Sequence, residues 1–214
     1  MSRVLVKICG ITRLEDALLA ARLGADRVGF NFWPRSRRYL APEAAAAMVA
    51  ALPPGVLPVG VFVDPSAEEL GAALRTSGVR AVQLHGDEPP ELCAALSVPV
   101  VKGIRVRDAN SLSALFTYPV SGFLLDSATP LYGGSGTAFD WSLAAEVAAQ
   151  VPVWLAGGLT PENVAEAVRR VRPHGVDVAS GVESSPGVKD PGRMEAFIRA
   201  AKAAGWGLLG KEGS

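Results

Sequence analysis

Short runs of apolar residues alternate with longer stretches of helical periodicity from one end of this chain to the other. An apolar run bounded by glycine, proline or polar residues predicts a buried β-strand, whereas apolar residues spaced three and four apart predict a helix. The predicted strands are Val4–Ile8, Arg27–Phe30, Leu57–Val63, Ala81–Leu84, Val98–Lys102, Gly122–Asp126, Val153–Ala156 and Gly175–Ala179. The predicted helices are Leu14–Leu23, Pro42–Leu52, Ala67–Thr76, Pro90–Leu96, Asp108–Phe116, Trp141–Ala149, Pro161–Val171 and Gly192–Ala204.

Capping residues mark several of the predicted helix boundaries. Ser66 and Glu69 have the spacing of a capping box. Thr160 and the proline after it place a cap residue before the first helical position, where the missing N–H of proline costs nothing. Gly24 and Gly78 mark helix ends, since glycine readily takes the left-handed conformation required there.

Eight strand–helix units in alternation predict a single-domain (β/α)8 barrel, the α/β fold called a TIM barrel, over residues 1–214. The competing α/β architecture is a doubly wound open sheet, which shows the same alternation. We favour the barrel because no Gly-x-Gly-x-x-Gly motif follows the first strand and the alternation continues to eight units. No linker or change in composition indicates a second domain.

Polar side chains gather where the predicted strands end. They are Lys7, Cys9, Asn31, Asp64, Gln83, His85, Lys102, Asp126, Asp177 and Ser180. In this fold the catalytic groups lie at the carboxyl ends of the strands and in the loops that follow them. The pattern therefore indicates an enzyme with its active site at that end of the barrel.

The first predicted strand carries an amine and a thiol, on Lys7 and Cys9. Side chains two residues apart share a face of a strand, so the two groups point the same way and the amine favours the thiolate. A thiolate at this place can act as a base or as a nucleophile. The alternative is that Cys9 is a small buried hydrophobic residue, as we expect for Cys93 in the fourth predicted helix.

Asp126 ends the sixth predicted strand and shares its inward face with Gly122 and Leu124. A carboxyl group at an apolar strand end can serve as a general acid. The alternative is a helix cap or an ion pair with Lys102 on the neighbouring strand. His85 is a further candidate for proton transfer, although a lone histidine is more often a structural hydrogen-bond partner.

Gly157 and Gly158 follow the seventh predicted strand, and Ser180 and Gly181 follow the eighth. Glycine lets the backbone approach an anion closely, and the helix after the seventh strand presents free N–H groups at its start. The loops after strands seven and eight are the usual phosphate site of this fold. These loops therefore predict a phosphate-binding site, with tight turns of no binding role as the alternative.

Two further loops carry candidate function. Arg35, Arg37 and Arg38 follow the second predicted strand, and arginine can bind a carboxylate through two parallel hydrogen bonds. Since most surface arginines are only solvated, we expect at most one of them to bind a ligand. The segment Tyr132–Thr137 contains three glycines and predicts a mobile lid beside Asp126, with a connection of no function as the alternative.

Composition excludes several classes of function. The formal net charge is +0 and the sequence pI is about 6.7, so no basic footprint for nucleic acid is present. No run of about 18 apolar residues predicts a membrane span, and no secretory signal is evident. The two cysteines form no disulfide framework, and the two histidines lack metal-ligand spacing. We therefore expect a cytoplasmic protein that uses no metal and no cofactor.

Six motifs, in order along nearly the whole chain, resemble those of the phosphoribosylanthranilate isomerase family of tryptophan biosynthesis. They are Lys7–Thr12, Gln83–Gly86, Leu124–Ser127, Gly133–Gly136, Ala156–Leu159 and Asp177–Glu183. The resemblance implies an Amadori rearrangement that converts N-(5-phosphoribosyl)anthranilate to 1-(2-carboxyphenylamino)-1-deoxyribulose 5-phosphate. The partner is then this small phosphorylated sugar, and the sequence leaves a monomer and a homodimer equally open.

The resemblance also implies residue roles. Asp126 is the general acid that protonates the furanose ring oxygen, and Cys9 is the general base that removes the proton from C2. Arg38 matches the residue that binds the anthranilate group, and Asp177 matches a contact to a sugar hydroxyl. The implied substrate-binding residues are Lys7, Arg38, Gln83, His85 and Asp177. The implied phosphate-binding residues are Gly157, Gly158, Ser180 and Gly181.

Two other functions remain open at this point. A related sugar-phosphate enzyme could use Lys7 or Lys102 as a Schiff-base nucleophile, which would make the protein an aldolase. A barrel that binds a phosphorylated ligand without catalysis is the second alternative. Such a protein would not need Cys9 and Asp126 to face each other above the phosphate loops.

Overall fold

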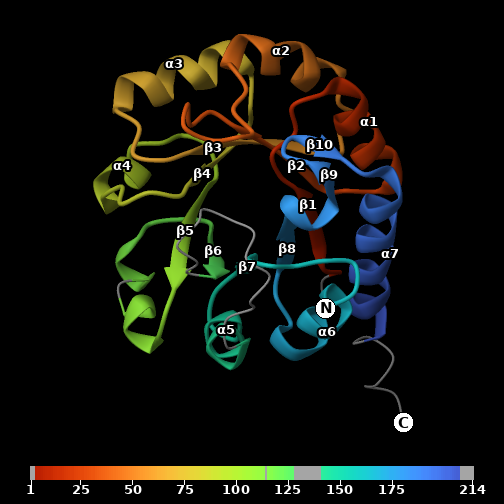
Figure 1. Cartoon of the computed structure of the whole chain (residues 1–214). Coiled ribbons are helices and arrows are strands. Elements are labelled where there is room, and N and C mark those ends of the chain that lie inside the picture. The colour runs from red at the N-terminus through yellow and green to blue at the C-terminus, as the bar shows by residue number, and fades with distance from the viewer. Residues whose placement is uncertain (1–2, 114, 128–140, 208–214) are drawn as a thin grey trace.

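The structure, a computed structural model, describes residues 3–113, 115–127 and 141–207. Eight parallel strands form a closed barrel in which each strand pairs with the next and the eighth pairs with the first (Figure 1). The strands are β1 (Leu5–Ile8), β2 (Arg27–Asn31), β3 (Leu57–Phe62), β4 (Ala81–Leu84), β5 (Val100–Val106), β6 (Gly122–Ser127), β7 (Val153–Leu155) and β8 (Gly175–Val178). The predicted barrel is confirmed, and the open doubly wound sheet is wrong because β1 and β8 are paired.

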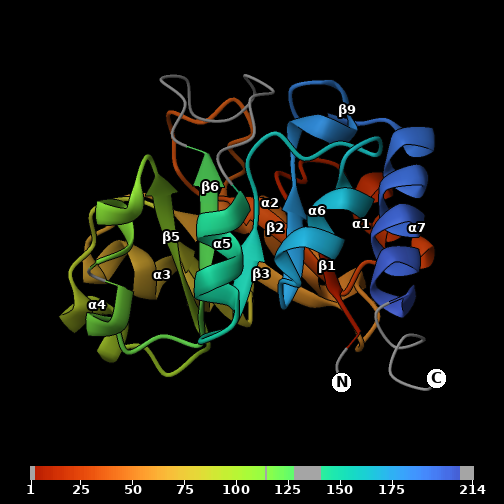
Figure 2. The ribbon, with the colours of Figure 1, turned by 90° about the horizontal axis from the view of Figure 1, so that it is seen from below.

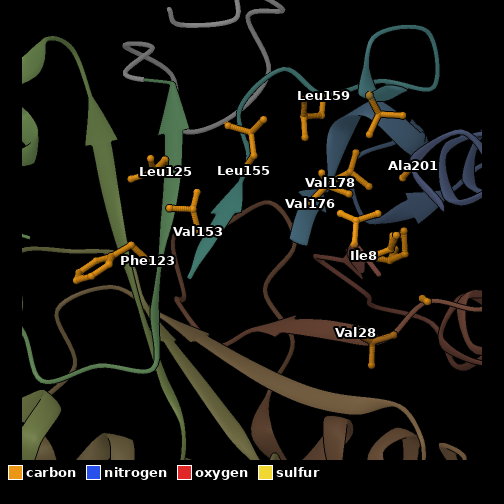
Figure 3. Packing of buried hydrophobic residues seen from close by; sticks show 14 of the residues in the cluster. Ile8, Val28, Phe123, Leu125, Val153, Leu155, Leu159, Val176, Val178 and Ala201 are labelled. Atoms are coloured by element: carbon orange, nitrogen blue, oxygen red, sulfur yellow. The ribbon is translucent and has the colours of Figure 1, made fainter. Parts of the chain in front are cut away.

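The strands bury both of their faces. Residues on the outer face share one hydrophobic cluster with residues of the helices that ring the barrel, such as Ala144 and Val147. Figure 3 shows four of the strand residues, Phe123, Leu125, Val153 and Leu155. Residues on the inner face form a smaller cluster of Val101, Leu124, Trp154 and Ala156, packed against Leu5. Because successive side chains alternate between the faces, Lys7 and Cys9 lie on the same inner face as Leu5.

Seven α-helices surround the barrel within the described residues (Figure 1). They are α1 (Leu14–Leu23), α2 (Pro42–Ala51), α3 (Ala67–Ser77), α4 (Pro90–Ala94), α5 (Trp141–Ala148), α6 (Val164–Val171) and α7 (Pro191–Gly207). The capping box of Ser66 and Glu69 is confirmed, with both of its hydrogen bonds formed. Gly24 and Gly78 end α1 and α3 in the left-handed conformation, as predicted.

Two helix predictions are wrong. The segment 108–116 forms two 3-10 helices, η1 (Ala109–Leu112) and η2 (Leu115–Thr117), because Asp108 and serines in this segment bond to nearby backbone instead of favouring an α-helix. Helix α6 begins at Val164 and not at the predicted proline. The Asn163 side chain accepts a hydrogen bond from the Thr160 N–H at 2.8 Å and donates one to the Gly158 carbonyl at 2.9 Å, which holds the intervening residues in a turn.

The carboxyl ends of the strands meet at one end of the barrel, and the chain begins at the other (Figure 2). A short helix η3 (Ser180–Val182) and a hairpin of β9 (Glu183–Ser185) and β10 (Val188–Lys189) lie between β8 and α7, and the sequence did not predict them. Strand β5 extends to Val106, so Lys102 lies within the strand and not at its end. Within the described ranges, no helix combines the length and apolarity needed to cross a membrane.

Candidate active site

Lys7 lies inside the barrel, where its ammonium group has two oxygen partners. The Nζ atom is 2.9 Å from Asp177 Oδ1 and 3.0 Å from Gln83 Oε1. Pairing between β1 and β8 sets Lys7 directly beside Asp177. Burial favours the neutral amine, but Asp177 and Cys9 outweigh it and raise the pKa of Lys7 above its usual value. Lys7 is therefore a buried cation held by a carboxylate and an amide oxygen.

Cys9 is buried immediately after β1, next to Lys7. A Cβ atom on Gly29 of β2 would lie 2.9 Å from the Cys9 sulfur and 3.0 Å from Lys7 Cε, so only glycine leaves room for both side chains. Burial raises the pKa of the Cys9 thiol, although the charge of Lys7 acts in the opposite direction. Lys7 thus favours the thiolate as expected, and desolvation opposes that effect and is the larger of the two influences.

Asp126 is the penultimate residue of β6, on the inner face, and keeps 22% of its side chain exposed. Its Oδ2 atom is 3.5 Å from His85 Nε2, and His85 Nδ1 is 2.9 Å from Gln83 Nε2. The alternative ion pair of Asp126 with Lys102 is wrong, since Lys102 Nζ lies 2.5 Å from Glu88 in a fully buried pair. Asp126 thus belongs to a row of polar groups that reaches Lys7.

Of the arginines in the loop after β2, Arg38 is the one that reaches the site, where Glu183 binds it. Arg38 Nε is 2.8 Å from Glu183 Oε1 and Arg38 Nη2 is 2.6 Å from Oε2, a bidentate pair. Lys189 Nζ contacts the same carboxylate at 2.8 Å and donates to the Cys9 carbonyl at 2.5 Å. Burial alone would raise the pKa of Glu183, but Arg38 and Lys189 outweigh it and lower that pKa.

Sequence reasoning did not identify Glu183, Lys189 or Glu88 as members of the site. Glu183 was visible only as the end of the motif after β8, and Lys189 lies on the unpredicted strand β10. Lys102 could be recognised from sequence as a candidate because it is a lysine on an apolar segment. Its partner Glu88 could not be identified, because nothing in the sequence distinguishes it from the other acidic residues. The predicted lid segment Tyr132–Thr137 lies outside the described residues.

The two predicted phosphate loops lie against each other. Gly157 and Gly158 have φ angles of 82° and 66°, a conformation that other residues rarely adopt. A Cβ atom on Gly181 would overlap the carbonyl oxygen of Leu159, so the loop after β8 packs directly on the loop after β7. Ser180 begins helix η3 within the second loop. Two glycine-containing loops thus meet at the carboxyl ends of β7 and β8, where this fold commonly holds phosphate.

Ionisable side chains line the carboxyl ends of β1, β4, β6 and β8, and two glycine loops adjoin them. This combination defines the class: a TIM-barrel enzyme with its site at the usual end of the barrel. The family model described as N-(5'phosphoribosyl)anthranilate (PRA) isomerase matches residues 6–200. The chain belongs to this family, and it is therefore an isomerase of tryptophan biosynthesis.

Named relatives align with this chain over nearly its whole length. The N-(5'-phosphoribosyl)anthranilate isomerase of Myxococcus xanthus is 52% identical over 205 residues, which cover 94% of this chain and 97% of that protein. That of Geobacter sulfurreducens is 50% identical and covers 95% of this chain and 100% of its own length. A crystal structure of the enzyme from Thermotoga maritima has a TM-score of 0.88 and 46% identity, covering 94% of this chain and 99% of that one.

A further solved member of the family carries a ligand. That phosphoribosyl anthranilate isomerase, in complex with reduced 1-(o-carboxyphenylamino)-1-deoxyribulose 5-phosphate, has a TM-score of 0.84 and 42% identity to this chain. The aligned parts cover 94% of this chain and 99% of that one. The bound molecule combines a carboxylate, a sugar and a phosphate group.

Proposed function

We propose that this chain catalyses the Amadori rearrangement of N-(5-phosphoribosyl)anthranilate with Asp126 as general acid and Cys9 as general base. The observation that carries the proposal is the position of these two side chains. Both lie on the inner face at the carboxyl ends of their strands, one after β1 and one on β6. Acid and base then reach a substrate at the same mouth of the barrel from two sides.

The reaction needs one proton donated and one removed. Asp126 gives its proton to the furanose ring oxygen, the bond from C1 to that oxygen breaks, and the ring opens to a Schiff base. Cys9, as thiolate, then takes the proton from C2, and the resulting enolamine tautomerises to the ketone. Burial raises the pKa of Cys9, so the active fraction of the base increases with pH, and Lys7 stabilises the thiolate once it has formed.

Substrate binding is divided among the groups around this pair. We assign the phosphate to Gly157, Gly158, Ser180 and Gly181, and the remaining contacts to Lys7, Arg38, Gln83, His85 and Asp177. Arg38 is suited to the anthranilate carboxylate because Glu183 occupies Nε and Nη2, and Nη1 makes no hydrogen bond to the described residues. Asp177 is suited to a sugar hydroxyl, with Lys7 holding one of its oxygens.

Three wider assignments follow. We propose that residues 1–214 form one barrel domain, supported by the pairing of β1 with β8 that joins the two halves of the chain. Both cysteines are free thiols, which is typical of the reducing cytoplasm, and we assign the protein to that compartment. A Thermotoga maritima relative has been described as dimeric, so a homodimer is the assembly to test.

The decay of substrate fluorescence on addition of enzyme, without metal or nucleotide, tests the proposal. Cys9→Ala and Asp126→Asn should each lower kcat by roughly 10²–10⁴-fold with little change in KM, since removing a positioned acid or base has an effect of that size. Cys93→Ala is the matched control, because Cys93 is also buried but lies in helix α4.

Two results would contradict the assignment. Near-full kcat in Cys9→Ala would exclude Cys9 as the base. Absence of decay with a folded, substrate-binding wild type would exclude the isomerisation, and borohydride trapping would then test the aldolase alternative at Lys7. Lys102 is a poor Schiff-base candidate, because its Nζ is enclosed by Glu88 and the Gly86 carbonyl at 2.5 and 2.6 Å.

A further inference from the structure

A continuous row of side chains leads from the Lys7 ammonium group to the Asp126 carboxyl group across β1, β4 and β6. Lys7 Nζ is 3.0 Å from Gln83 Oε1, and Gln83 Nε2 is 2.9 Å from His85 Nδ1. His85 Nε2 is 3.5 Å from Asp126 Oδ2. The isomerisation chemistry proposed above uses Asp126 as the acid and assigns Gln83 and His85 only to substrate contacts, which leaves the row itself unexplained.

The chemistry of Lys7 fixes the orientation of the Gln83 amide. An ammonium group has only donors, and the raised pKa of Lys7 keeps the group charged. The carbonyl oxygen of Gln83 must therefore face Lys7, which turns the NH2 group of the amide toward His85. This NH2 group is itself only a donor. His85 Nδ1 must accept, so Nδ1 carries no proton and the proton of the neutral ring lies on Nε2.

The surrounding residues hold the ring in this place. A Cβ atom on Gly103 of β5 would lie 2.7 Å from His85 Nδ1, so glycine is required for the imidazole to pack against that strand. The carbonyl of His85 accepts a hydrogen bond from Arg105 Nη2 at 3.3 Å. Rotation of the ring by half a turn would replace the Nδ1 acceptor by the Cδ2–H group and leave the NH2 group of Gln83 without an acceptor. The Nε2–H group is therefore directed at Asp126.

We infer that Lys7 and Gln83 hold His85 as the neutral Nε2–H tautomer, and that this N–H positions the Asp126 carboxyl group for proton donation. This inference rests on the general-acid role proposed for Asp126. An N–H donor at Oδ2 makes Oδ2 the carbonyl oxygen of the protonated acid, so the acidic hydrogen lies on Oδ1. After proton transfer, the same N–H stabilises the carboxylate. His85 acts through Asp126 and is a positioning residue.

The distance of 3.5 Å is long for a hydrogen bond in the free protein. Catalytic hydrogen bonds are often long before substrate binds and shorten in the complex. The row of groups sets the direction of the N–H in advance, and only a small movement of the partly exposed Asp126 side chain is then required.

Nitrogen NMR of histidine-labelled protein reads the tautomer directly. The chain has only two histidines, and His174→Gln assigns the signals of His85 by difference. We expect His85 in the wild type to show a protonated Nε2 and an unprotonated Nδ1. Gln83→Glu replaces the NH2 donor by an acceptor, so Nδ1 should gain a proton in that variant. A wild-type spectrum with the proton on Nδ1 would overturn the inference without any variant having to fold.

Steady-state kinetics test whether the Nε2–H group of His85 positions Asp126 for proton donation. The terminal amide of His85→Gln lies near the former Nε2 and can still donate to Asp126, whereas that of His85→Asn stops near the former Nδ1. We expect His85→Asn to lower kcat about 10- to 100-fold with little change in KM, the effect of misplacing a reacting group by about 1 Å. His85→Gln should recover most of that loss.

A purely structural role would affect both variants alike, and equal kcat values would therefore overturn the inference. Asp126→Asn, measured in parallel, separates this result from failure of the proposed function. Full activity of Asp126→Asn would contradict the general-acid role, and the positioning role with it. The tautomer read by NMR does not depend on turnover, so the orientation of His85 would still be known.

Discussion

Buried charges decide the chemistry of this protein at the scale of single residues. Three lysines are buried within the described residues, and each has a carboxylate partner. The pairs are Lys7 with Asp177, Lys102 with Glu88, and Lys189 with Glu183. Removing one partner of a buried pair leaves an uncompensated charge, which typically costs about 3–5 kcal/mol. The pairs of Lys7 and Lys189 therefore fix side-chain positions around Cys9 and Arg38.

Glu183 makes the stability of the protein depend on acid pH. Its pKa is lowered in the folded state, so its ionised form contributes stability that is fully present above the unfolded pKa of about 4.3 and is lost as pH falls through the folded value. Glu183→Gln should lower the free energy of unfolding by about 3–5 kcal/mol near pH 7. The difference from wild type should shrink below about pH 4.

Urea unfolding at a series of pH values measures this difference. Glu195→Gln is the control, because Glu195 is an exposed glutamate on α7 and its loss should change stability by less than about 0.5 kcal/mol. A difference for Glu183→Gln that stays constant down to pH 3 would show that ionisation of Glu183 does not stabilise the fold.

At the scale of elements, the turns after the strands position the backbone to which we assign phosphate binding. The sequence predicted the loop after β7 correctly, but it predicted that helix α6 begins at Pro161, whereas the helix begins at Val164. Thr160 followed by Pro161 is a residue pair typical of a helix start. The side chain of Asn163, however, holds the preceding residues in a turn and moves the helix start by one turn. Gly157 and Gly158 therefore lie in a loop of their own rather than at the first turn of a helix.

Contact between the two glycine loops should be required for phosphate binding. Gly181→Ala places a Cβ atom on the Leu159 carbonyl oxygen, so the backbone of one loop must move. We expect KM to rise about 10- to 100-fold with a smaller change in kcat, because binding common to substrate and transition state is lost. Steady-state kinetics and inhibition by inorganic phosphate measure the effect.

Gly192→Ala is the matched control for this variant. A Cβ atom on Gly192 would be 3.4 Å from its nearest neighbour, Asp190 Oδ1, which is ordinary contact. Its kinetics should equal those of the wild type. An unchanged KM in Gly181→Ala would show that the loops do not hold the phosphate together.

At the scale of the whole molecule, closure of the barrel brings the two ends of the chain together. Strand β1 pairs with β8, and helix α7 packs against α1, α6 and β1 (Figure 1). Phe197 of α7 is fully buried in the main hydrophobic cluster. Because the last helix completes the packing around the first strand, loss of its contacts should destabilise the entire barrel and not only the C-terminal segment.

Phe197→Ala should therefore lower the free energy of unfolding by about 3–5 kcal/mol, the usual cost of deleting a buried aromatic ring. Circular dichroism and fluorescence should report one coincident urea transition. Phe116→Ala is the control, because Phe116 is 64% exposed and its removal should change stability by less than about 0.5 kcal/mol. Separate transitions would mean that α7 unfolds independently.

Much of the fold and part of the site follow from local sequence. The alternation of strands and helices determined the barrel, because each signal depends on residues within one segment. The two-residue period of a strand also determined that Lys7, Cys9 and Asp126 lie on inner faces near strand ends. These predictions need no knowledge of which segments become neighbours.

Only the tertiary structure decided which groups meet. Lys7 contacts Asp177, 170 residues further along the chain, and Arg38 contacts Glu183 across 145 residues. Such partners are chosen when the barrel closes, and sequence gives no rule for selecting among its acidic residues. The pKa of Cys9 illustrates the same limit. The sequence determined that an amine lies beside the thiol, but burial inside the closed barrel decided the direction of the shift, because desolvation depends on every atom that surrounds the group.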